Sequence, residues 1–130
     1  MKICRHILAV FCFCCAACGL WGQDFTRVDA FARSVELNQL TLAQLTDSLT
    51  GRYKTDLEKV RSIFVWIAHN IAYDYEKRDI TESDTLAYLS NPLFDDSKLI
   101  ENVLKRRKGI CYDYSYLFRA MCTVSGIKAK

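Results

Sequence analysis

Residues 105–129 read KRRKGICYDYSYLFRAMCTVSGIKA. Two patterns overlap here: tyrosines at 112, 114 and 116 alternate with polar residues as in a half-buried strand, while apolar side chains recur at helical spacing. The helical pattern covers the longer window, and Ser125-Gly126 follows it as a stop. We therefore predict a helix that begins at Cys111. Its apolar set comprises Tyr114, Leu117, Phe118, Met121 and Val124.

Cys111 at the start of this helix is the residue best suited to covalent chemistry. A helix N-terminus offers N–H groups without intrahelical partners and a partial positive charge, and both favour a thiolate. Such a position lowers a thiol pKa from about 8.5 to between about 3.5 and 7.5. The cations at 105–108 add to this effect, and Gly109 permits a close approach of backbone or substrate. From the residues alone, a buried structural cysteine is nevertheless the more common explanation.

Upstream, Thr55 and Glu58 form a capping-box pattern in front of a strongly amphipathic segment. The segment predicts a helix of about 17 residues, whose buried face Ile63 and Trp66 widen. Shorter helices are expected near 25–35 and 41–49, and another from 95–97 to a stop at Gly109. The apolar stripe of the long helix comprises Leu57, Val60, Phe64, Ile67 and Ile71.

The first 22 residues have the pattern of a signal peptide. Lys2 and Arg5 precede an uncharged, mostly apolar run at 7–17, which is too short for a membrane span of about 20 residues. Small residues follow, so we expect cleavage between Ala17 and Gln23 and export to the periplasm or the exterior of a bacterium. The run at 15–18, Cys-Ala-Ala-Cys, also resembles a lipobox, which leaves a lipid anchor at Cys18 as an alternative.

Composition and charge exclude several classes of protein. A hydrophobic fraction of 51% excludes a disordered chain. The net charge is +3, and it falls to +1 without residues 1–22, which hold two cations and no acidic residue. This balance predicts no nucleic-acid partner and no membrane contact apart from a lipid anchor at Cys18. The oligomeric state is left open.

Only two of the seven cysteines, Cys111 and Cys122, lie outside the first 22 residues. Export favours disulfides, but on one helix these residues lie about 16 Å apart, too far for an S–S bond. We expect Cys122 to be a small core residue. The two cysteines and His69 are too few for a zinc site, and no pattern indicates a cofactor.

The other polar candidates have mainly structural explanations. His69 lies about 200° around its helix from Ile67, so it should face away from the packed stripe. We expect Asp113 to complement the helix N-terminus rather than to orient a catalytic base, and 105–108 to form a solvated helix end. Two further pairs belong to this group: Tyr112 and Tyr114 are assigned to packing, and Asp95 and Asp96 to capping.

Segment 105–129 resembles the nucleophile motif of the transglutaminase-like superfamily, in which G-[VI]-C opens a helix that ends in a small-Gly-Ile step. Segment 54–74, with Trp66-Ile67 and its 70–74 run Asn-Ile-Ala-Tyr-Asp, is similar to the upstream part of that family. Residues 42–50 fit the lead-in of the branch related to the kyphoscoliosis peptidase. The resemblance covers nearly all of residues 40–130.

The resemblance implies an α+β, papain-like fold with a helical lobe that carries the cysteine and an antiparallel sheet that carries a His and an Asp. It implies that Cys111 attacks an amide carbonyl of a protein or peptide and forms a thioester that water or an amine resolves. We expect a signal peptide at 1–22, a helical lead-in at 23–54 and the N-terminal half of the domain at 55–130. This range covers mainly the helical lobe, with the sheet missing or incomplete. No residue here matches the family's His or Asp, so we expect no turnover from these 130 residues alone. The alternative is a non-catalytic module on the same fold that binds peptide or cell wall.

Overall fold

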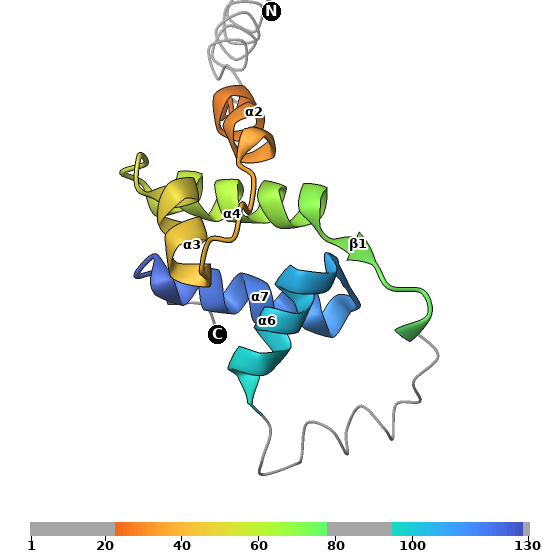
Figure 1. Ribbon diagram of the computed structural model, residues 1–130. Helices are drawn as coiled ribbons and strands as arrows, with labels where there is room; N and C mark the ends of the chain where they lie inside the picture. Colours follow the sequence, from red (N-terminus) through yellow and green to blue (C-terminus); the bar gives the residue numbers. More distant parts are fainter. Residues whose placement is uncertain (1–22, 78–94, 129–130) are drawn as a thin grey trace, which may run out of the picture.

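The computed structural model describes residues 23–77 and 95–128. The predicted signal peptide and the lipid anchor at Cys18 lie outside these residues. The elements, in chain order, are α2 (Thr26–Ser34), α3 (Leu42–Thr50), α4 (Asp56–Asn70), β1 (Ala72–Tyr73), α6 (Asp96–Arg106), β2 (Lys108–Gly109) and α7 (Cys111–Val124). Figure 1 shows α4 above α7, with α2 over the far side of α4 and α6 crossing α7.

The core lies between α4 and the helices around it. Helices α2, α3 and α7 all contact α4, and α6 packs on α7. Trp66 of α4 is fully buried, and its indole N–H donates to the carbonyl of Val35 at 2.8 Å. Ser62 is also buried and donates to the Leu49 carbonyl at 2.9 Å. These two bonds hold the lead-in segment against α4. They also give hydrogen-bond partners to the Ser62 hydroxyl and the Trp66 indole N–H, which would otherwise be buried without one.

The predicted helix ends are largely confirmed. Thr41 and Thr55 cap α3 and α4, and each forms a capping box with the residue three positions on. At the end of α7, Gly126 has a φ of +80°, and the N–H of Ile127 donates to the Cys122 carbonyl. This is a Schellman arrangement, so the predicted Ser125-Gly126 stop is correct.

The buried face of α4 was predicted incorrectly in part. Leu57 and Phe64 are 51% and 55% exposed, whereas Ile63, Trp66 and Ile67 are buried. The helix is shorter than predicted, at 15 residues, and ends at Asn70. Because α4 contacts helices on more than one side, its buried face is rotated around the helix relative to the single apolar stripe that the sequence predicts.

A two-stranded parallel ladder follows, which the sequence patterns did not predict. Ala72 pairs with Lys108 and Tyr73 with Gly109. Helix α6 ends at Arg106, and Arg107, at a φ of +55°, makes the left-handed turn that had been assigned to Gly109. Gly109 lies in β2 instead. The strands are too short for a periodic signal, and their pairing depends on contacts 36 residues apart.

The described residues therefore form mainly helices with one small sheet, which agrees with the predicted α+β class represented mostly by its helical lobe. Within 23–77 and 95–128, no helix has the length and apolarity needed to cross a membrane.

Candidate functional site

Cys111 is the first residue of α7, and it is exposed. This position contradicts the alternative of a buried structural cysteine. Ile110 occupies the N-cap position with an extended backbone, and its side chain has no atom that accepts a hydrogen bond. The first N–H groups of α7 consequently have no side-chain cap at that position. One turn on, the Ser115 hydroxyl donates to the Cys111 carbonyl at 2.9 Å.

Cys122, on the same helix, is buried, and burial raises the pKa of its thiol. Both Cys111 and Cys122 are free thiols. The expectations that they form no disulfide and that Cys122 is a core residue are confirmed. The two thiols thus differ in access to solvent as well as in position on the helix.

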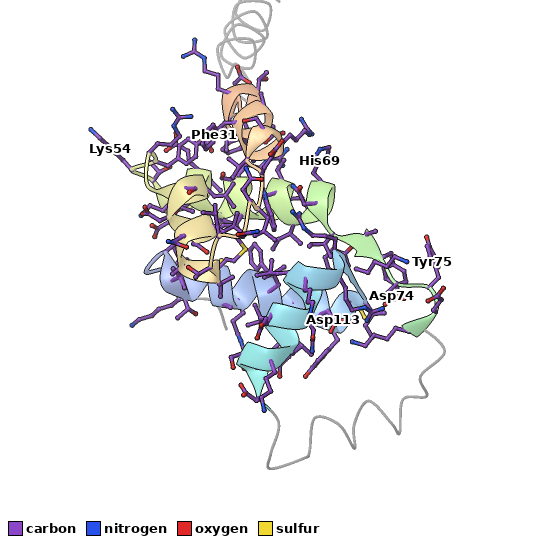
Figure 2. The ribbon with its side chains drawn as sticks, viewed as in Figure 1. Phe31, Lys54, His69, Asp74, Tyr75 and Asp113 are labelled. Atoms are coloured by element: carbon purple, nitrogen blue, oxygen red, sulfur yellow. The ribbon has the colours of Figure 1, made fainter. Side chains whose placement is uncertain are left out.

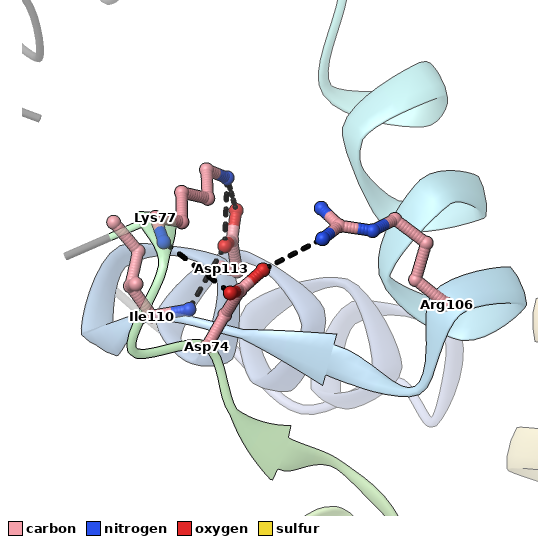
Figure 3. Close-up of polar contacts among 5 residues, drawn as sticks. All are labelled: Asp74, Lys77, Arg106, Ile110 and Asp113. Atoms are coloured by element: carbon pink, nitrogen blue, oxygen red, sulfur yellow. Dashed lines mark hydrogen bonds and ion pairs between the residues drawn. The ribbon is translucent and has the colours of Figure 1, made fainter.

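Asp113 closes the start of α7 from within the helix. Its carboxylate is 1% exposed, and Oδ2 accepts from the N–H of Ile110 at 2.9 Å. Both of its oxygens also accept from Lys77 Nζ, at 2.9 and 2.8 Å. Figure 3 shows this arrangement. The expectation that Asp113 serves the helix N-terminus is correct, and its partner Lys77 carries no sequence signal that pointed to this role.

A second buried carboxylate, that of Asp74, lies next to this pair. It accepts from Arg106 at 2.8 Å and from the N–H of Lys77 at 3.3 Å (Figure 3). The backbone N–H of Asp74 also continues the ladder by donating to the Gly109 carbonyl at 2.9 Å. Arg107 lies over the Trp66 ring. The prediction of a solvated basic run at 105–108 is therefore wrong for Arg107, which is half-buried against Trp66, while Arg106 is exposed but pairs with Asp74.

Tyr112 and Tyr114 are half-buried against the core, as expected for packing residues. The hydroxyl of Tyr114 donates to the carbonyl of Ile71 at 2.5 Å, and burial raises its pKa. Tyr114 also lines an apolar hollow of about 410 Å³ between α4 and α7, together with Phe64, Ile67, Ala68, Ser115 and Phe118.

The remaining sequence candidates do not join the site. His69 is exposed, and Figure 2 shows it on the side of α4 away from α7. Asp95 caps α6 by accepting from the Ser97 N–H at 2.9 Å. Asp96 pairs with Arg119 across the surface. In the part of the chain that the structure describes, no three potential ligands gather to hold a metal ion.

The family model described as "Transglutaminase-like superfamily" matches residues 43–130, a range that includes all but the first residue of α3 and every later element. The chain belongs to the transglutaminase-like superfamily. Among its relatives, the kyphoscoliosis peptidase of Mus musculus is 33% identical over 104 residues, which cover 80% of this chain and 14% of the relative. The kyphoscoliosis peptidase of Homo sapiens is 31% identical over 106 residues, with coverages of 82% and 14%.

Hillarin of Drosophila melanogaster is 32% identical over 108 residues, which cover 80% of this chain and 11% of the relative. The chain thus spans less than a sixth of the length of these three relatives. No solved structure matches the chain. The fold family is established by these likenesses, and the role of each site residue depends on the geometry described above.

Proposed function

We propose that the protein is an exported cysteine hydrolase or acyltransferase that acts on amide bonds of proteins or peptides, with Cys111 as its nucleophile. One observation carries this proposal: an exposed thiol occupies the first position of a 14-residue helix in a transglutaminase-like domain. The two mammalian relatives are named peptidases, which is in keeping with cleavage of an amide bond.

In the proposed reaction, the Cys111 thiolate attacks the carbonyl carbon of the amide, and a C–S bond forms. As negative charge develops on it, the carbonyl oxygen accepts hydrogen bonds from backbone N–H groups at the start of α7, where the N-cap residue offers no side-chain acceptor. The C–N bond then breaks, and the nitrogen leaves as an amine or as ammonia after taking up a proton. Water or a second amine attacks the resulting thioester and releases the thiol.

The leaving nitrogen needs a proton donor within about 2.6–3.2 Å, a role that His most often fills. His69 is unsuited to this role because it lies on the side of α4 away from α7. Asp113 is also unsuited, since its carboxylate is engaged by Lys77 and by the Ile110 N–H. We therefore propose that the general acid comes from outside the described residues.

The test uses the protein produced from its complete reading frame. Three reactions are followed: cleavage of a denatured labelled casein, release of ammonia from glutamine peptides, and transfer of a fluorescent primary amine to the same peptides. We expect turnover in at least one assay, and a loss of about 10³-fold or more in Cys111→Ala. Cys122→Ala is the matched control, because it removes the other thiol of the same helix and should retain turnover.

Turnover that survives in Cys111→Ala would contradict the proposal. The alternative, a non-catalytic binding module, predicts a different result. In that case none of the three reactions occurs, while the wild type and Cys111→Ala bind immobilised peptide or cell-wall material equally well.

Export rests on a separate observation, the short apolar run at 7–17 behind Lys2 and Arg5. We expect the mature N-terminus to lie between Ala17 and Gln23, and mass spectrometry of the protein purified from its host measures it directly. A lipid mass on Cys18 would identify the anchored form. An intact Met1 on protein recovered from the cytosol would contradict export.

A further inference from the structure

Two buried carboxylates lie beside the first turn of α7, and each meets a cation from another element (Figure 3). Asp74 pairs with Arg106 of α6, and Asp113 pairs with Lys77, which follows β1. Both carboxylates are 1% exposed, whereas the side chains of Lys77 and Arg106 are 30% and 52% exposed. Breaking a pair of this kind costs more stability than breaking a fully exposed one, because it leaves a buried carboxylate without its partner.

The Asp113 pair acts on the backbone next to Cys111. Asp113 accepts from the N–H of Ile110, the residue immediately before Cys111, and from Lys77 Nζ with both oxygens. One side chain thus joins three parts of the chain: the N-cap of α7, the first turn of α7 and the segment after β1. The position of the Cys111 backbone follows from these contacts.

Gly109 provides the room for this arrangement. A Cβ atom at residue 109 would lie 2.8 Å from the Asp113 Cβ and 3.3 Å from its Oδ2. The first distance is shorter than a carbon–carbon contact allows, so any larger residue would displace Asp113 from Ile110. The glycine in front of the cysteine is therefore required for the carboxylate to reach the N-cap.

The pair also balances charge at the start of α7, the helix whose first residue is Cys111. Among the described residues, the charged groups that pair with Asp113 or gather near it include Asp74 and Lys77 after β1, Arg106 of α6 and Lys108 of β2. Arg106 is engaged by Asp74, which leaves Lys77 as the cation bound to Asp113. Without Lys77, a bare carboxylate two residues from Cys111 would disfavour the thiolate.

We propose that Lys77 and Asp113 are positioning residues for Cys111: their ion pair fixes the start of α7 and keeps this end of the helix neutral. This inference rests on the proposed function, in which Cys111 is the nucleophile. It goes further by assigning a role to a residue 34 positions upstream of Cys111, for which the sequence patterns gave no signal.

Four variants of the protein from its complete reading frame test the proposal. Lys77→Met leaves the Asp113 carboxylate without its cation, whereas Lys77→Arg keeps a positive charge at this position. Asp113→Asn removes the charge while its amide oxygen can still accept from the Ile110 N–H. Arg119→Met is the matched control: Arg119 also lies on α7, and the substitution breaks its pair with Asp96 of α6, in which both side chains are 46% exposed.

The first readout is the rate of iodoacetamide reaction at Cys111 as a function of pH, resolved from Cys122 by peptide mass spectrometry. We expect the profile of Lys77→Met to move to higher pH and that of Asp113→Asn to lower pH, each by about half a unit to one unit. Lys77→Arg and Arg119→Met should keep the wild-type profile. A purely structural pair would lower the melting temperature of both variants without displacing the profiles in opposite directions, and that result would overturn the proposal.

The second readout is turnover. We expect kcat of Lys77→Met to fall about tenfold or more, because small displacements of a reacting group are costly, while KM changes less than about threefold. Lys77→Arg should recover most of kcat. An unchanged kcat in Lys77→Met would also overturn the proposal.

Two features keep the test decisive. If Lys77→Met does not fold, two variants replace it: Asp113→Asn and the neutral double variant Lys77→Met/Asp113→Asn. An alkylation profile of Asp113→Asn that is identical to that of Arg119→Met would then overturn the proposal. If no Cys111-dependent turnover exists, the proposed function fails. The alkylation profiles still decide whether the Lys77–Asp113 pair controls the pH at which Cys111 reacts.

Discussion

The guanidinium of Arg106 binds the buried carboxylate of Asp74 at 2.8 Å, across 32 residues of sequence. The contact fastens the end of α6 to the segment that follows β1. Strand β1 and the start of this segment are held by the ladder bonds from the Ala72 N–H to the Arg107 carbonyl and from the Asp74 N–H to the Gly109 carbonyl. The loop in front of Cys111 is therefore fixed from the side of α6 and β1 as well as by Asp113.

Replacing Arg106 with Met should destabilise the fold by about 1–3 kcal/mol, because Asp74 stays buried while losing its charged partner. Denaturant unfolding followed by circular dichroism measures this change. Arg119→Met, which breaks an exposed pair, should cost less than about 1 kcal/mol. Equal losses in the free energy of unfolding for Arg106→Met and Arg119→Met would show that burial of Asp74 does not raise the cost of breaking its ion pair.

The two faces of α4 give a second prediction. Ile63→Ala should cost about 2–5 kcal/mol, because Ile63 is fully buried. Phe64→Ala should cost no more than about 1 kcal/mol, since complete burial of a Phe is worth only about 1.5–3 kcal/mol and Phe64 is 55% exposed. The same unfolding experiment compares them. A larger loss at Phe64 would restore the apolar stripe that the sequence periodicity favoured.

These elements show what the sequence could and could not predict. The cap at Thr55, the Ser125-Gly126 stop and the Cys111 helix start are local patterns, and each appears where predicted. The orientation of α4 depends instead on which helices surround it, and periodicity alone does not contain that information.

The site divides in the same way. Cys111 could be singled out because the helix start, the preceding glycine and the family motif all lie within a few residues. Asp74, Lys77 and Arg106 could not be assigned, because their partners lie 32 to 36 residues away in sequence. Gly109 was interpreted as a helix stop and as a place where backbone or substrate can approach closely, whereas the group that lies close to it is the Asp113 side chain.

Gly109→Ala is the most direct test of that steric role. The added methyl group would lie 2.8 Å from the Asp113 Cβ, so we expect a loss of about 1–3 kcal/mol in the free energy of unfolding. The double variant Gly109→Ala/Asp113→Gly removes the Cβ atom that the added methyl group would meet. It should therefore lose less stability than the sum of the two single variants. Strict additivity would show that the two residues do not interact.

The buried thiol of Cys122 makes stability depend on pH at the alkaline end. Burial raises its pKa above the value of an unfolded thiol, which is about 8.5. The folded state therefore holds its proton more tightly, and this contribution is complete below pH 8.5 and is lost as the pH rises through the folded pKa. The melting temperature of the wild type should fall more steeply above pH 8.5 than that of Cys122→Ala. Parallel curves would contradict this linkage.

The two thiols should also react at very different rates in the folded protein. At pH 7, iodoacetamide should label Cys111 well before Cys122, because Cys111 is exposed at a helix start while Cys122 is buried with a raised pKa. Peptide mass spectrometry after short reaction times measures both rates in one sample. In strong denaturant both thiols should be equally accessible to iodoacetamide. Any difference in rate that remains there comes from neighbouring residues in the sequence, and the rest comes from the fold. Faster labelling of Cys122 in the folded protein would contradict the position of α7, and a Cys111–Cys122 disulfide would be incompatible with a single helix.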